Sequence, residues 1–69
     1  MKTEAQINNY GKAIKLTRID KEMLQMNVAE KAGISVSFLS DIENGKSAPS
    51  IKTLSKIADA LGVNISDFF

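Results

Sequence analysis

The side chains best able to do chemistry in this sequence lie on the outward face of one predicted helix, 36–44. Ser37 and Ser40 can donate or accept hydrogen bonds, and Asp41 can accept them. The sequence contains no His and no Cys, which excludes imidazole and thiolate zinc sites, Cys or Ser/His nucleophilic chemistry, and histidine proton shuttles. This face therefore suits recognition of a hydrogen-bonding partner better than catalysis.

The carboxylates of this region do not form a catalytic pair. Asp41 and Glu43 are two positions apart on the same predicted helix, so their side chains do not face one another as a general acid and base would. We therefore expect the protein not to be an enzyme. We also expect no cofactor, no metal and no small-molecule ligand.

The composition indicates one small domain over residues 1–69, with its core at about 7–69. The chain has 43% hydrophobic and 25% charged residues, as compact globular domains do, and no disulfide can support its core. Its net charge is only +1, so any nucleic-acid partner must be held by local placement of positive charge. No linker or repeat marks out a separate ligand-sensing domain.

No targeting or membrane segment is evident in the sequence. No run approaches the roughly 20 apolar residues that span a bilayer, and the first residues lack the apolar stretch of a secretory signal. We therefore expect a cytoplasmic protein that does not contact a membrane.

The spacing of apolar residues predicts an all-α fold of five short helices. Gly33, Gly45 and Gly62 each follow a segment with helical periodicity, as glycines do where a left-handed residue ends a helix. No alternating apolar and polar run predicts a strand. The expected helices cover about 6–20, 24–32, 36–44, 51–61 and 65–69, the last as a short turn or helix; Ile7, Tyr10 and Ile14 form the apolar stripe of the first.

Residues 25–44 follow the pattern of a tight helix-turn-helix. Ala29 lies where the two helices would cross closely, and Gly33 begins a short turn, 33–35, that sets two helices at a steep angle. An ordinary helical corner without any nucleic-acid function has the same geometry, and this alternative stays open at this point. The positions expected to be buried are Val28, Ala32, Ile34, Leu39 and Ile42.

Residues in a recognisable order and spacing extend this pattern over nearly the whole chain. They are Tyr10, Gly11, Ile14 and Arg18; Gln25 and 28–35; 38–46; and 49–51, Leu54 and 57–63. In this pattern the chain resembles the Xre-like helix-turn-helix family, which includes lambda-type repressors, Cro proteins and the small controller proteins of restriction–modification systems. The resemblance implies a five-helix domain that binds double-stranded operator DNA as a homodimer, with recognition helices about 34 Å apart in successive major grooves.

The resemblance makes the outward face of helix 36–44 the expected base-reading surface. The Val36 methyl groups can contact thymine, Ser37 and Ser40 can donate or accept, and Asp41 can accept from a cytosine amino group. None is a bidentate reader, and Asp41 repels phosphate, so part of the specificity is expected from DNA shape or from residues elsewhere. For each residue alone, a merely solvated position is the alternative.

The family pattern also places residues that contact the DNA backbone or brace the recognition helix. Gln25 opens the second helix, where it contacts phosphate or supports a recognition residue, although Leu24 replaces the usual Ser or Thr cap before it. Arg18 and Glu43 match a partly buried structural ion pair. The other expected phosphate contacts, in the loop after the recognition helix, are Asn44, Lys46 and Ser47, with Lys52 and Lys21 adding positive charge.

Two apolar groups suggest contacts with other chains. Val63, Ile65, Phe68 and Phe69 are candidates for the dimer seam, with closure of the core as the alternative. A second group is apolar at positions where the family more often has polar residues. Either a slightly rotated first helix buries some of them, or they form an apolar surface for a protein partner or a neighbouring subunit. The members of this group are Leu16, Ile19, Met23 and Met26.

The sequence thus predicts a sequence-specific transcriptional regulator acting as a homodimer on a palindromic site, and it does not choose between repression and activation. The alternative is a protein-interaction module, such as an antitoxin-like subunit whose DNA binding is secondary.

Overall fold

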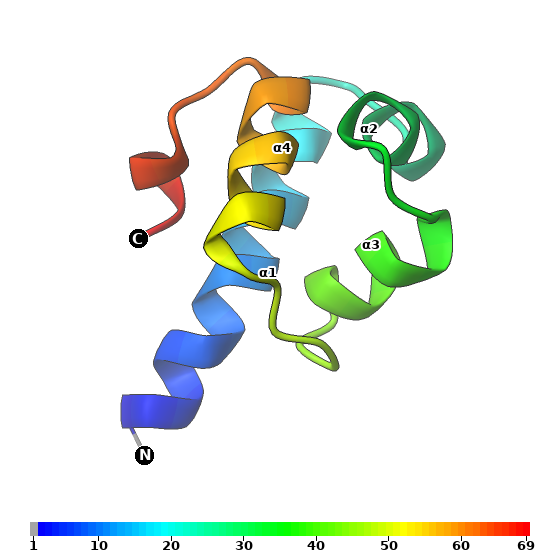
Figure 1. Ribbon diagram of the computed structural model, residues 1–69. Helices are drawn as coiled ribbons and strands as arrows, with labels where there is room; N and C mark the ends of the chain where they lie inside the picture. The colour runs from blue at the N-terminus through cyan, green and yellow to red at the C-terminus, as the bar shows by residue number, and fades with distance from the viewer. Residues whose placement is uncertain (1) are drawn as a thin grey trace.

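Four α-helices and one 3-10 helix make up the fold (Figure 1). The computed structural model describes the backbone of residues 2–69 and the side chains from residue 10 onward. No strand occurs among the described residues, which confirms the predicted all-α class. The elements are α1 (Lys2–Asp20), α2 (Gln25–Ala32), α3 (Val36–Glu43), α4 (Ile51–Leu61) and the 3-10 helix η1 (Ile65–Phe68).

The prediction of five helices is therefore correct only in part. The last element is a single 3-10 turn of 4 residues, in which the Asp67 N–H donates to the Asn64 carbonyl at 2.9 Å and the Phe69 N–H to the Ser66 carbonyl at 3.2 Å. Both hydrogen bonds span three residues, as in a 3-10 helix.

The core lies between α1, α2, α3, α4 and η1. Ile14, Val28, Leu39 and Ile42 are buried as the periodicity predicts, whereas Tyr10 and Ile34 are only half-buried. Ile7, which the sequence places on the inner stripe of α1, lies outside the residues whose side chains are described. The buried core residues are Ile14, Val28, Ala29, Ala32, Leu39, Ile42, Leu54, Ile57, Ala58, Leu61 and Phe68.

All four α-helices end in the same hydrogen-bonded motif. After α2, the Gly33 N–H donates to the Glu30 carbonyl at 3.2 Å and the Ile34 N–H to the Ala29 carbonyl at 3.0 Å, which is a Schellman motif. The residue that turns the chain has a positive φ in each case, 73° at Gly33. At the end of α1 this position is Glu22, with φ 57° and no glycine.

The backbone of α1 touches the end of α3 at Gly11. A Cβ atom at this position would lie 2.1 Å from the Ile42 carbonyl oxygen and 2.9 Å from that of Glu43. Such distances are far below van der Waals contact, so only glycine allows the two helices to approach this closely. Gly11 therefore fixes how near the C-terminal end of α3 lies to the first helix.

No helix among residues 2–69 is both long enough and apolar enough to cross a membrane.

Candidate nucleic-acid interface

The start of α3 is exposed and rigidly capped. The Ser35 Oγ accepts a hydrogen bond from the Phe38 N–H at 3.0 Å, which fixes the first turn of the helix as an N-cap. Val36 is 44% exposed, Ser37 is exposed, and Ser40 and Asp41 are half-buried. The four predicted base-reading residues therefore share one helix but differ in exposure, and the most exposed of them lie in its N-terminal turn.

The loop after α3 is held against the helix by the carbonyl of Asp41. This oxygen accepts the Lys46 N–H at 2.8 Å and the Ser47 N–H at 3.3 Å. In the same turn, the Asn44 Nδ2 lies 3.4 Å from the Ser40 Oγ. The structure thus brings three predicted phosphate-contacting residues, Asn44, Lys46 and Ser47, to the end of the predicted base-reading helix.

The end of α3 carries Lys46 where the other three helix ends carry an apolar residue. In a Schellman motif the residue after the left-handed position commonly makes an apolar contact with the helix. Met23, Ile34 and Val63 occupy this position after α1, α2 and α4, and all three pack against the core. After α3 the same position carries Lys46, which is exposed. An exposed cation in place of an apolar contact stabilises the fold less and leaves a positive charge at the surface.

A buried hydrogen-bond network joins α1, α2 and α3. The Arg18 Nε lies 2.8 Å from Glu43 Oε2, and the Arg18 Nη2 lies 3.1 Å from Glu43 Oε1. The Gln25 Nε2 donates to the same Oε1 at 3.0 Å, and the Arg18 Nη1 donates to the Met23 carbonyl at 3.0 Å. The Glu43 side chain is 1% exposed, so its charge is removed from water but fully partnered.

The structure gives the Gln25 side chain a hydrogen-bond partner that the sequence alone does not identify. One amide N–H of Gln25 is used by Glu43, so the side chain links the start of α2 to the end of α3. The amide group has a second N–H. Gln25 is half-buried at the first position of α2.

The N-terminus of α2 lacks a side-chain cap, as the sequence predicts. Leu24 is the N-cap residue, and its side chain, 63% exposed, cannot accept a hydrogen bond. Asn27 partly compensates, because its Oδ1 accepts the Leu24 N–H at 3.1 Å.

The structure separates the candidate dimer-seam residues into three kinds. Phe68 is 2% exposed and belongs to the core of the single chain, so its assignment to a seam is wrong and the alternative of core closure holds for it. Val63 and Ile65 are half-buried against the same core. Phe69 is 67% exposed, and its ring meets that of Tyr10 edge-on at a centroid distance of 5.3 Å.

The atypical apolar residues of the first two helices are mostly uncovered. Leu16, Ile19 and Met26 are between 51% and 62% exposed, so rotation of α1 does not bury them. Met23 is the exception, because it packs against the core after the end of α1.

Sequence reasoning missed two parts of this arrangement. The contact of Gly11 with α3 had a signal, a glycine inside a helical pattern, which usually has a packing reason. The second part is the apolar residue that follows the left-handed position after α1, α2 and α4, and that is Lys46 after α3. Comparing the residues that follow each predicted helix could have found this difference.

Comparisons with known proteins place this arrangement among known folds. A family model described as helix-turn-helix matches residues 14–68. The chain is 43% identical over 56 residues to the immunity repressor protein of Bacillus phage phi105, covering 81% of this chain and 39% of the repressor. It is 37% identical over 57 residues to multiprotein-bridging factor 1 of Saccharomyces cerevisiae, covering 83% of this chain and 38% of that factor. The chain thus spans well under half the length of both proteins.

The fold also matches that of a solved structure along almost its entire length. The restriction-modification controller protein C.AhdI from Aeromonas hydrophila superimposes with a TM-score of 0.90 at 25% sequence identity. The match covers 94% of this chain and 98% of the controller protein.

Proposed function

Because the chain belongs to the helix-turn-helix family of Xre- and lambda-like domains, we propose that it is a DNA-binding transcriptional regulator that binds a palindromic operator as a homodimer. The observation that carries this proposal is the exposed N-terminal turn of α3, a helix whose start is capped by Ser35 and whose last residue, Glu43, is bound by Arg18 and Gln25. A fixed, exposed recognition helix is what insertion into a major groove requires.

Base reading is assigned to the outward face of α3. Ser37 is the main hydrogen-bonding reader, because it is exposed in the first turn, and Val36 supplies an apolar contact for a thymine methyl. Ser40 and Asp41 lie deeper in the helix and are half-buried, so they take a smaller part. With no bidentate reader among the four, DNA shape contributes to the choice of site.

Phosphate binding is assigned to the two ends of the helix-turn-helix. Lys46, with Ser47 and Asn44 beside it, supplies the charge and hydrogen-bond donors after α3, and Gln25 supplies its second amide N–H before α2. The Asp41 carbonyl positions this loop by accepting the Lys46 and Ser47 N–H groups. These contacts set the register of α3 on the duplex without reading its sequence.

Homodimer binding follows from the weak charge of one domain. At a net charge of +1, a single copy gains little from the DNA backbone, and two copies on paired half-sites double the contacts. Two-fold symmetry then requires a palindromic operator. Repression is the favoured outcome, since the similar phage protein is an immunity repressor.

Fluorescence anisotropy on labelled promoter-proximal and random duplexes, at several salt concentrations, tests this function. We expect a log–log salt slope of several units and two copies bound per palindromic site. Absence of binding to any duplex at low salt would contradict the proposal.

The second candidate function is a protein-interaction module with secondary DNA binding, such as an antitoxin-like subunit. The similarity to a factor named for bridging several proteins favours it, as do the exposed apolar side chains of Leu16, Ile19 and Met26. Weak, sequence-independent DNA binding in the same titration would favour this module over the regulator.

A further inference from the structure

The loop after α3 begins with an asparagine that is followed by a glycine, Asn44 and Gly45, and this pair of residues has its own chemistry. No other asparagine in the sequence precedes a glycine. Because glycine has no side chain, its backbone nitrogen can approach the side-chain carbonyl carbon of the preceding asparagine without hindrance. Asparagine is a chemically labile residue, which the proteins of hyperthermophiles contain less often.

The reaction open to this pair is hydrolysis of the Asn44 side-chain amide by way of a cyclic imide. The Gly45 nitrogen attacks the Asn44 Cγ, the Cγ–Nδ2 bond breaks, and the proton lost by Gly45 leaves with the ammonia. Water then opens the ring at one of its two carbonyl groups, which gives aspartate or isoaspartate and restores the Gly45 N–H. The sum is amide plus water to carboxylate plus ammonium, so water is the only co-reactant.

The structure exposes the reacting amide but holds it in an unreactive geometry. Asn44 is exposed at the C-cap of α3, with φ −91° and ψ 2°. At this ψ the Gly45 nitrogen lies beside the Asn44 backbone nitrogen and not beside the Asn44 side chain. The Gly45 N–H also donates to the Ile42 carbonyl at 3.1 Å. Ring closure therefore requires a rotation about ψ and the loss of this hydrogen bond.

The contacts that oppose this rotation lie at a helix end and are few. The Asn44 Nδ2 lies 3.4 Å from the Ser40 Oγ, which is long for a hydrogen bond. The rotation would also release the Lys46 N–H from the Asp41 carbonyl, whereas Gly45 itself adopts other conformations readily. Opening of a helix end is among the least costly local motions of a protein. The reactive geometry is therefore reached without unfolding of the domain.

We propose that Asn44 is a site of spontaneous deamidation, which replaces one of the proposed phosphate contacts with a carboxylate and weakens DNA binding as the protein ages. The new charge lies in the same loop as Lys46 and Ser47, where it repels phosphate and offsets the lysine. It also lies at the C-terminal end of α3, where the helix dipole disfavours a negative charge. The effect on DNA binding rests on the proposed function, whereas the chemistry does not.

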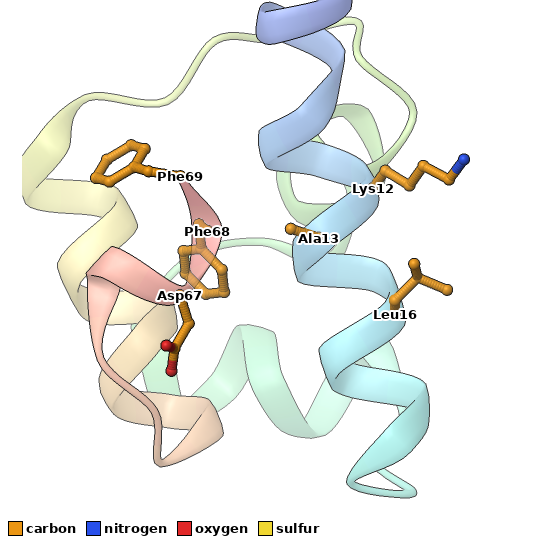
Figure 2. Close-up of a pocket in the computed structure, with 6 residues that line it drawn as sticks. All are labelled: Lys12, Ala13, Leu16, Asp67, Phe68 and Phe69. Atoms are coloured by element: carbon orange, nitrogen blue, oxygen red, sulfur yellow. The ribbon is translucent and has the colours of Figure 1, made fainter.

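Two other exposed asparagines provide controls within the same chain. Asn27 and Asn64 are exposed, but Val28 and Ile65 follow them, and a β-branched side chain hinders attack by its own backbone nitrogen. Asn64 precedes η1, which lies on the other side of α4 from α3 in Figure 1. Its N–H donates at 3.3 Å to the Oδ2 of Asp67, the carboxylate drawn in Figure 2. Both controls lack the glycine that follows Asn44.

Peptide mapping of the aged full chain tests the chemistry. Trypsin cleaves after lysine and arginine, so Asn44, Asn27 and Asn64 fall in separate peptides, 32–46, 22–31 and 57–69. Mass spectrometry follows the replacement of NH₂ by OH during incubation at neutral and mildly alkaline pH, relative to a sample that was not incubated. We expect peptide 32–46 to be converted about tenfold faster than the controls, or more, with a higher rate at the higher pH and with two isomeric products.

Anisotropy titrations test the consequence for DNA binding. Asn44→Asp carries the charge of the product and should raise the Kd for a duplex on the order of tenfold, and the aged wild-type chain should approach the same value. Asn44→Gln keeps an amide but reacts only through a larger ring, so its Kd should stay at the value of its own fresh sample during the same incubation. Circular dichroism confirms that both variants keep their helices.

Two results would overturn the inference. One is conversion of peptide 32–46 no faster than that of the two control peptides. The other is an aged chain with this peptide converted that binds duplexes as tightly as the fresh chain does. If the fresh wild-type chain bound no duplex, the proposed function would fail together with this consequence, whereas conversion at Asn44 would still be measured by mass spectrometry.

Discussion

Arg18 and Glu43, which are 25 residues apart in the chain, form a two-point ion pair between the end of α1 and the end of α3. The carboxylate is 1% exposed and the guanidinium side chain 13% exposed. The backbone of Glu43 also meets α1 at Gly11, where an added Cβ atom would lie 2.9 Å from the Glu43 carbonyl oxygen. The position of the recognition helix thus depends on a charge that is hidden from water and on the partners that neutralise it.

Replacing Arg18 alone should destabilise the protein strongly. Arg18→Met leaves Glu43 buried with only Gln25 as a partner, and an unpaired buried charge of this kind costs about 3–5 kcal/mol. Urea denaturation followed by circular dichroism measures the loss. The double variant Arg18→Met with Glu43→Met should recover at least half of it, since apolar replacement of a buried pair is often neutral. A loss under about 1 kcal/mol in the single variant would show that the pair is effectively solvated.

Adding one methyl group at Gly11 should force α1 and α3 apart. Alanine favours a helix over glycine by about 1 kcal/mol, but its Cβ would lie 2.1 Å from the Ile42 carbonyl oxygen, and overpacking of this kind costs about 1–3 kcal/mol. We expect Gly11→Ala to lower the midpoint of urea unfolding and to weaken DNA binding where it still folds. Lys15→Ala, at an exposed position of the same helix, is the control. Unfolding of Gly11→Ala at a higher urea concentration than the wild type would refute the close contact.

The regular parts of the fold could be predicted because they depend on local signals. Glycine stops, the Ser35 N-cap and the 3.6-residue apolar spacing each act within one or two turns, and the ends of α2, α3 and α4 follow Gly33, Gly45 and Gly62. The character of η1 could not be predicted, because a single turn is decided by packing against the rest of the core. Phe68 illustrates this, since a terminal apolar ring can close a core or form an interface, and only the three-dimensional structure distinguishes them.

Removing the charge of Lys46 should weaken DNA binding without a cost to stability. The side chain is exposed, so Lys46→Ala should change the free energy of unfolding by less than about 0.5 kcal/mol. Anisotropy titrations should show weaker binding to every duplex alike and a salt slope reduced by about one unit per copy. Lys56→Ala removes the same charge from α4 and should have little effect. If Lys46→Ala changed the preferred sequence instead, Lys46 would be a base reader and not a phosphate contact.

Ser37→Ala should alter the choice of site more than the overall affinity. The hydroxyl is exposed in the first turn of α3, where side chains reach base edges, and a lost base contact costs about 1–3 kcal/mol at one or two base pairs. Binding selection from a randomised duplex pool would show whether the preference relaxes at those positions. Ser40→Ala, at a half-buried position of the same helix, should have a smaller effect. A uniform loss across all duplexes would instead assign Ser37 to phosphate binding.

The resemblance predicts the Arg18–Glu43 pair that the structure shows, but not the hydrogen bond from Gln25 to Glu43, and the base-reading residues stay a prediction. Spacing placed Val36, Ser37, Ser40 and Asp41 on one face of a helix, which is a one-dimensional property of the sequence. The hydrogen bond between Gln25 and Glu43 depends on how α2 packs against α3. Side-chain conformations between two helices produce no periodic pattern in the sequence, so this bond cannot be predicted from spacing. Lys46 illustrates an intermediate case, because the resemblance already predicts it as a phosphate contact, whereas its position in the Schellman motif after α3 is seen in the structure.

Restoring a cap to α2 should stabilise the protein. The Leu24 side chain cannot satisfy an N–H of the first turn, whereas a Ser or Thr side chain can, with a typical gain of about 1 kcal/mol. Leu24→Thr should therefore raise the midpoint of urea unfolding, and since Leu24 is 63% exposed, little buried contact is lost. Ser35→Ala is the matched converse, because it removes the observed 3.0 Å cap of α3 and should cost a similar amount. If Leu24→Thr lowered the midpoint while Ser35→Ala behaved as expected, the leucine side chain would have to be covered in solution, which sedimentation of the wild-type chain would reveal.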